Sequence, residues 1–315
     1  MQTSSGIHHI TAITGDPRKN IEFYEGFLGQ RLVKRTVNFD DPSSYHFYFG
    51  DAYGKPGTLI TFFFWKGIPK GTRGTGEVSR IAYTIEPAAK EFWITRARIF
   101  GVTCTEGVNE FGEPVLMLRD PDDMTIELMM VGKNQNVDAW GESDVSPESM
   151  LGGFYGATLT VVSIEEMETV LAELGYAKQT TAGEHARFVT TGERATILDV
   201  VEAPDLPQSR QGSGSVHHIA FRATGDAEEL EMRAQIEKTG SHPTPVIDRQ
   251  YFHSVYFMTP GRILFEIATD SPGFAIDEPK ESLGEHLVLP PMYEPHRAEI
   301  EKTLLPVSLP RHDRK

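Results

Sequence analysis

Cysteine is almost absent from this sequence, since Cys104 is the only one among 315 residues. One cysteine excludes an internal disulfide bond and any metal site built from several thiolates, so a metal here must be held by histidine and carboxylate side chains. The sequence also lacks an apolar run long enough to span a membrane. Residues 1–6 show no basic segment leading into an apolar one. We therefore expect a cytoplasmic protein.

Positive charge is scarce as well, because 30 Lys and Arg residues face 45 Asp and Glu residues and give a net charge of -15. This excess of acid argues against nucleic acid and anionic membranes as partners. The length suggests two domains, each able to bury a core, and a homo-oligomer is compatible with it. Eleven histidines make a histidine-based metal site feasible.

Four segments of the chain share one pattern. Each begins with an expected strand and continues through an amphipathic helix that ends at a glycine suited to a left-handed cap. The strands are expected at Ile7–Ile13, Val78–Ile85, Tyr155–Val162 and Val216–Ala223, and the glycines are Gly29, Gly101, Gly175 and Gly240. Residues 78–83 match residues 216–221 best. Any α+β protein has strands, helices and capping glycines, but the shared order and spacing favour four copies of one unit.

A polar, glycine-containing stretch separates the two halves. We predict an N-terminal domain of two units at residues 1–132, a linker at 133–152 and a C-terminal domain of two units at 153–270. Residues 271–315 fit no unit. We predict that they form an extended tail that is either wrapped over the body or partly mobile, with a short helix in the charged segment 294–302.

Two pairs of adjacent histidines occupy the same place in units one and four: His8 with His9, and His217 with His218. In a strand, alternate side chains face the same side, so His9 and Thr11 should project together while His8 points away. A lone buried histidine more often only satisfies a hydrogen bond. The repetition of the pair favours metal ligation.

A third ligand is available in the apolar run 262–268, which contains Glu266. A carboxylate is expensive to bury unless it is paired or bound to a metal. A hairpin of residues 251–257 with 262–268 would place Tyr256 and Glu266 on one face. Glu266 is therefore the preferred carboxylate.

Glu127 is the rival in unit two, but Arg80 stands there in the position of His218, so Glu127 lacks a partner imidazole and can pair with Arg80 or Arg119 instead. The predicted ligands are then His9, His218 and Glu266. Two imidazoles and one carboxylate leave coordination positions open for substrate and dioxygen, as in non-haem Fe(II) oxygenases. Zn would favour closed or hydrolytic sites, and Mn(II) is a possible substitute for Fe(II).

Several stretches resemble the vicinal oxygen chelate superfamily (glyoxalase, bleomycin resistance and extradiol dioxygenase proteins), and more narrowly its ring-cleaving dioxygenase group, which includes hydroquinone-type dioxygenases. These stretches are residues 6–11, 27–29, 36–42, 215–221 and, most specifically, 248–257 with 265–270. The resemblance covers nearly the whole chain. It implies an α+β fold of four βαβββ units, paired into two domains with curved mixed sheets that enclose a metal.

The resemblance also implies an activity, the opening of a hydroquinone- or catechol-type ring by Fe(II) and O2. The ligands of the family fall on His9, His218 and Glu266, in agreement with the set reached from the residues. The substrate-proximal residues of the family fall on His8, Thr11, His217, Arg249 and Tyr256. Strand alternation allows His8 and His217 to lie instead on the side that faces a helix.

Two other activities fit the same resemblance. A glyoxalase-like isomerase or lyase generally needs two carboxylates, and residues 61–65 at the end of unit one contain none. A metal-free small-molecule binding protein would leave Glu266 buried between imidazoles, which is unfavourable unless they protonate. The aromatic residues within 47–49 and 62–65 could line a pocket for an aromatic ring, but β-propensity also explains them as sheet core.

Overall fold

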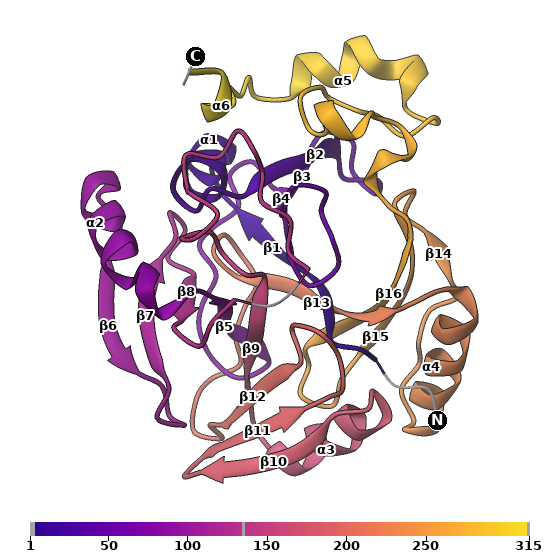
Figure 1. Cartoon of the computed structure of the whole chain (residues 1–315). Coiled ribbons are helices and arrows are strands. Elements are labelled where there is room, and N and C mark those ends of the chain that lie inside the picture. The colour runs from indigo at the N-terminus through magenta and orange to yellow at the C-terminus, as the bar shows by residue number, and fades with distance from the viewer. Residues whose placement is uncertain (1–3, 134–135, 314–315) are drawn as a thin grey trace.

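The computed structural model describes residues 4–133 and 136–313. In this part of the chain, sixteen strands form two eight-stranded sheets with a few helices on their outer faces (Figure 1). Both sheets mix parallel and antiparallel pairs. The predicted α+β class is confirmed. No described helix is both long enough and apolar enough to cross a membrane.

Each predicted unit has the order strand, helix, three strands. Unit one contains β1 (Ile7–Thr14), α1 (Pro17–Ile21), β2 (Arg31–Val37), β3 (Tyr45–Gly50) and β4 (Leu59–Phe64). Unit two contains β5 (Glu77–Thr84), α2 (Lys90–Phe100), β6 (Cys104–Val108), β7 (Pro114–Arg119) and β8 (Thr125–Met129). Unit three contains β9 (Phe154–Val161), α3 (Ile164–Glu173), β10 (Ala177–Ala182), β11 (His185–Val189) and β12 (Ile197–Glu202). Unit four contains β13 (Val216–Ala223), α4 (Asp226–Lys238), β14 (Ile247–Asp248), β15 (Phe252–Met258) and β16 (Leu264–Pro272).

The sheets join units that do not follow each other in the chain. One sheet has the order β14-β15-β16-β13-β1-β4-β3-β2, and the other has the order β10-β11-β12-β9-β5-β8-β7-β6. Unit one therefore pairs with unit four, through antiparallel β1 and β13, and unit two pairs with unit three, through β5 and β9. The division into residues 1–132 and 153–270 stays a prediction, and the sheets cross it.

The helices end where the glycines predict. Gly29, Gly101, Gly175 and Gly240 all have positive φ, and Gly101 is the left-handed cap of α2 with φ 68°. The helix of unit one departs from the others, because α1 spans five residues and continues as a π-helical segment, Glu22–Phe27. Side chains of both sheets, such as Ile10 and Leu159, belong to one continuous apolar core.

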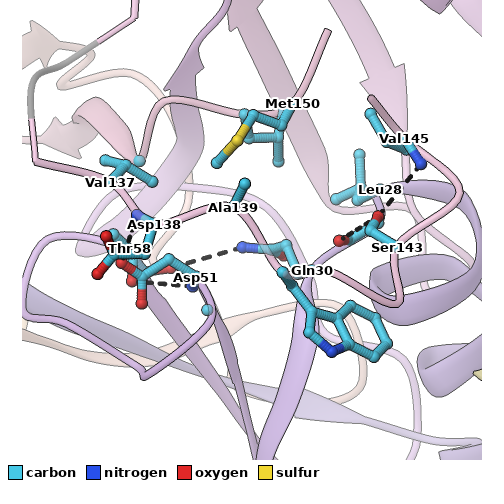
Figure 2. A pocket seen from close by; sticks show the side chains of 15 residues that line it. Leu28, Gln30, Asp51, Thr58, Val137, Asp138, Ala139, Ser143, Val145 and Met150 are labelled. Atoms are coloured by element: carbon cyan, nitrogen blue, oxygen red, sulfur yellow. Dashed lines mark hydrogen bonds between the residues drawn. The ribbon is translucent and has the colours of Figure 1, made fainter. Parts of the chain in front are cut away.

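The predicted linker packs against unit one rather than standing away from it. The backbone N–H of Asp138 donates to the Asp51 carboxylate at 3.1 Å, and the Ser143 hydroxyl donates to the carbonyl of Gly29 at 3.0 Å (Figure 2). A cavity of about 30 Å³ remains under this segment. It holds about one water molecule, so it is too small for a substrate.

The C-terminal tail wraps over unit one, and α5 (Arg297–Thr303) overlaps the segment expected to be helical (Figure 1). α6 (Pro310–Asp313) ends the described chain. The Arg311 guanidinium lies 2.6 Å from the Glu25 carboxylate, and both side chains are buried. The tail is therefore part of the folded body.

Candidate metal centre

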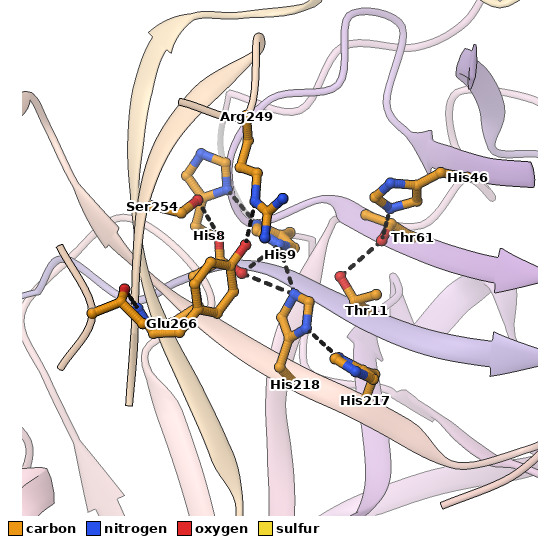
Figure 3. A network of polar contacts seen from close by, with 12 residues as sticks. His8, His9, Thr11, His46, Thr61, His217, His218, Arg249, Ser254 and Glu266 are labelled. Carbon is orange, nitrogen blue, oxygen red and sulfur yellow. Dashed lines mark hydrogen bonds and ion pairs between the residues drawn. The ribbon is translucent and has the colours of Figure 1, made fainter. Parts of the chain in front are cut away.

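The structure brings His9, His218 and Glu266 together, although they come from β1, β13 and β16. The Nε2 atoms of His9 and His218 lie 3.4 and 2.8 Å from Oε2 of Glu266, and 3.4 Å from each other (Figure 3). His9, His218 and Glu266 are 2%, 4% and 0% exposed, respectively. An ion with bonds of about 2.1 Å holds adjacent ligands about 3 Å apart. The separations fit one metal ion.

Two β-bulges explain how adjacent histidines reach the same region. The register of β1 against β13 shifts at His8 on one strand and at His217 on the other, so each of them is an extra residue without a partner across the ladder. A bulge breaks strict alternation and re-aims side chains. The alternation argument, which turned His8 and His217 away, therefore does not apply at these positions.

Each extra histidine contacts the ring nitrogen that the neighbouring histidine leaves free. Nδ1 of His8 lies 3.0 Å from Nδ1 of His9, and Nδ1 of His217 lies 2.8 Å from Nδ1 of His218. A metal on Nε2 requires the proton on Nδ1, and a hydrogen-bond acceptor at Nδ1 fixes that tautomer. His8 and His217 are thus placed to orient the two candidate ligands. His217 also lines the cavity described below, whereas His8 lies behind His9.

Ser254 supports the carboxylate from β15. Its hydroxyl donates to Oε1 of Glu266 at 2.5 Å, and Tyr256 pairs directly with Glu266 across β15 and β16, as the predicted hairpin required. The other oxygen, Oε2, has no well-directed hydrogen-bond donor among the described residues although it is fully buried. A buried carboxylate oxygen that lies between two imidazoles without a well-directed hydrogen bond is suited to binding a metal ion.

The protonation states also suit a metal. Burial alone would raise the pKa of Glu266, but the adjacent His9 and His218 hold it well below its usual range. Burial lowers the pKa of His218, although Glu266 opposes the shift. A carboxylate beside a neutral imidazole is the form that binds a divalent cation.

A cavity of about 410 Å³ opens over this group, within the range of about 300–1,000 Å³ found for small-molecule sites. Units one and four both contribute to its wall. The lining residues are His9, Thr11, Asn38, Phe39, Asp40, His46, Tyr48, Phe63, Trp65, His217, His218, Thr244, Ile247, Arg249, Phe252, Tyr256 and Leu264. Of the eight predicted site residues, seven line the cavity or supply its candidate ligands, and His8 contacts one of them.

Arg249 and Tyr256 form one end of the cavity. Arg249 Nε lies 3.3 Å from the Tyr256 hydroxyl, and its Nη1 lies 3.2 Å from the Asp40 carboxylate of unit one. The Tyr256 ring meets the His218 ring edge to face, with 5.7 Å between centroids. Burial raises the pKa of Tyr256, and Glu266 adds to the shift, so its hydroxyl stays protonated and can donate a hydrogen bond.

The sequence reasoning missed a polar chain on the opposite wall. Nε2 of His46 lies 2.9 Å from the Thr61 hydroxyl, which lies 2.8 Å from the Thr11 hydroxyl (Figure 3). The Tyr48 hydroxyl lies 2.9 Å from Nδ1 of His46. The aromatic runs 47–49 and 62–65 contained a signal for this wall, because their side chains alternate between the cavity and the core. Tyr48, Phe63 and Trp65 line the cavity, and the core residues are Phe47, Phe49, Phe62 and Phe64.

Unit one repeats the geometry of unit four with one substitution. Tyr48 pairs with Thr61 as Tyr256 pairs with Glu266. Thr61 thus stands where a second carboxylate would complete a ring of four ligands. In the other sheet, Glu127 takes the place of Glu266 and pairs at 3.1 Å with Arg80, one of its two expected partners. That position holds an ion pair.

Comparisons with known proteins give the same picture. Residues 6–128 match the family described as the Glyoxalase/Bleomycin resistance protein/Dioxygenase superfamily. MhqO of Bacillus subtilis (strain 168), provisionally named a ring-cleaving dioxygenase, is 43% identical over 96% of both chains. Chlorohydroquinone/hydroquinone 1,2-dioxygenase of Sphingobium indicum is 32% identical over 95% of both chains.

Two solved structures extend the comparison. A Bacillus subtilis protein that is provisionally described as a dioxygenase superposes with a TM-score of 0.94, at 42% identity, over 98% of this chain and 99% of that one. Glyoxalase I from Zea mays gives a TM-score of 0.63 at 14% identity, over 84% of this chain and 92% of that one. The second likeness concerns the fold alone.

Proposed function

The chain belongs to the Glyoxalase/Bleomycin resistance protein/Dioxygenase superfamily, and from that premise we propose that it is a ring-cleaving dioxygenase. In this proposal, one Fe(II) ion held by His9, His218 and Glu266 opens a hydroquinone- or catechol-type ring, and both atoms of O2 enter the product. Mn(II) is the alternative that these ligands admit. Relatives that are named dioxygenases and cover nearly the whole chain support the reaction class.

The observation that carries the proposal is the incomplete ligand ring beneath an aromatic-lined cavity. Three ligand groups converge, and Thr61 occupies the fourth place of the ring, so substrate and O2 have room beside the ion. When bound, Fe(II) would supply a Lewis-acidic centre that binds a phenolate oxygen and dioxygen together and passes electrons between them. Phe63 and Trp65, stacked at 5.9 Å, offer apolar surface to a ring.

The other cavity residues would bind and orient the substrate. The Tyr256 hydroxyl is protonated and can donate a hydrogen bond to a substrate oxygen, while Arg249 can balance negative charge on substrate or product. His217 lines the cavity as a neutral imidazole, because burial and the neighbouring His218 lower its pKa to about 3. Because its Nδ1 accepts the Nδ1–H of His218, its proton lies on Nε2, which can donate a hydrogen bond to a substrate oxygen. The Thr11 hydroxyl belongs to the polar chain that ends at His46.

The two other activities have less support. An isomerase of this fold would need a second carboxylate, and Thr61 stands in its place. A metal-free binding protein would leave Oε2 of Glu266 buried with only the imidazoles of His9 and His218 beside it and without a well-directed hydrogen bond. A buried carboxylate oxygen that is hydrogen-bonded so poorly is costly.

The test is to prepare the protein without oxygen, quantify bound metal, and follow O2 consumption with hydroquinone and with catechol. Glu266→Gln removes the carboxylate, and Glu127→Gln is the matched control at the equivalent position of the other sheet. We expect Fe(II)-dependent O2 uptake and a ring-opened product in the wild type and the control, and loss of both in Glu266→Gln. Bound metal without O2 uptake would move the isomerase ahead, and no bound metal would refute the ligand assignment.

A further inference from the structure

A second group of metal-ligand side chains lies on the other side of β15 from the candidate metal centre. Asp226, Glu229 and His253 each offer one ligand atom, and these atoms lie within 4.8 Å of one another. Asp226 and Glu229 belong to the first turns of α4, and His253 belongs to β15. The helix lies against this edge of the sheet (Figure 1).

Local geometry explains why the three converge. Residues three apart on a helix share a face, so Asp226 and Glu229 point the same way. Ser254 faces Glu266, whereas its neighbour His253 contacts Asp226 and therefore faces the helix. Nδ1 of His253 lies 2.9 Å from the Asp226 carboxylate.

Glu229 supplies an independent observation. Its side chain is 0% exposed, and neither carboxylate oxygen has a hydrogen-bond partner among the described residues. A buried carboxylate with no donor for either oxygen is costly, and a bound cation removes that cost. Burial raises the pKa of Glu229 to about 7, so the carboxyl gives up its proton to a cation near neutral pH with little resistance.

We propose that Asp226, Glu229 and His253 bind a second divalent cation of the zinc type, which fastens α4 to β15. Imidazole nitrogen and carboxylate oxygen are both zinc ligands, and water can complete the coordination because Asp226 is 67% exposed and His253 is 35% exposed. The partial positive charge at the start of α4 disfavours a cation, but the two negative carboxylates exceed it, so the net local charge still attracts a cation. The geometry and burial that indicate this site do not depend on the proposed function.

The site also has a structural consequence for the first one. His253 precedes Ser254, whose hydroxyl donates to Glu266. A cation at His253 would hold this part of β15 in place from behind. It would therefore act as a structural ion, and its loss would loosen the support of the candidate ligand carboxylate.

The experiment counts zinc in the metal-free full-length protein after equilibrium dialysis against Zn²⁺. Glu266→Gln is the background, because it disables the first centre and separates this proposal from the proposed function. We expect this background to keep one zinc per chain and to lose it when Glu229→Gln or His253→Asn is added. Glu231→Gln, an exposed glutamate on the same helix, is the matched control and should leave the count unchanged.

Thermal unfolding gives a second readout. Zn²⁺ should raise the melting temperature of the Glu266→Gln protein and should not raise it once His253→Asn is added. His253 is partly exposed, so this variant should fold even if Glu229→Gln does not. A background protein that binds no stoichiometric zinc, or binding that survives both substitutions, would overturn the proposal. A Glu229→Gln protein that is stabilised where the background binds no zinc would show that Glu229 is simply a protonated buried acid.

Discussion

Removing the Ser254 hydroxyl tests whether the support behind Glu266 controls metal affinity. Ser254 is fully buried, and its hydroxyl donates to Oε1 of Glu266 at 2.5 Å. In Ser254→Ala no solvent can replace that donor, so the carboxylate loses a hydrogen bond and a fixed orientation. A hydrogen bond to a charged group contributes about 1.5–3 kcal/mol. This corresponds to a roughly 10- to 100-fold weaker metal complex.

The measurement is the dissociation constant for Fe(II) or Mn(II), obtained without oxygen by competition with a chelator. Ser254→Thr keeps a hydroxyl and should recover most of the affinity, which a general packing defect would not allow. Ser282→Ala, at an exposed hydroxyl in the tail, is the control and should bind as the wild type does. Unchanged affinity in Ser254→Ala would refute the view that this hydrogen bond holds the ligand.

Three further predictions concern the rest of the chain. His46→Gln interrupts the polar chain through Thr61 and should slow ring cleavage about 10- to 100-fold in O2-uptake assays, with metal content unchanged; an unchanged rate would contradict it. Burial raises the pKa of Asp120 to about 7, so its contribution to stability falls as pH rises from about 4 to 7, by about 4 kcal/mol at most. Urea unfolding of Asp120→Asn should lack this pH dependence, and an equal slope in both proteins would contradict it. Arg311→Ala removes the Arg311 guanidinium from the buried Glu25 carboxylate and should cost about 3–5 kcal/mol of unfolding free energy; a loss below about 1 kcal/mol would show that the tail contributes little.

The candidate ligands could be predicted from the sequence because the patterns that mark them are local. A histidine pair at the start of a strand and a carboxylate in an apolar strand can be read without knowing which strands are neighbours. The register that sets Tyr256 opposite Glu266 followed from one short hairpin. The roles of these residues remain predictions, and the structure adds their distances.

The pairing of units could not be read in the same way. Which strand joins the free side of β1 depends on contacts between segments about 200 residues apart, and no local pattern records that choice. The bulges at His8 and His217 were missed for the same reason, since a bulge exists only relative to a partner strand. His46 and Thr61 gave no repeated motif, and only their alternation with core aromatics marks them.

The junction of β1 with β13 also sets the order of events during synthesis. His9 leaves the ribosome well before His218 and Glu266, which follow more than 200 residues later in the chain. Until then the nascent chain has an unpaired edge at β1 and an incomplete ligand set. Such an edge can pair with other chains, so a nascent protein of this topology must be shielded until unit four emerges. A metal ion at this centre would therefore bind only after unit four has been made, and a truncated chain that stops before residue 216 would lack two of the three candidate ligands.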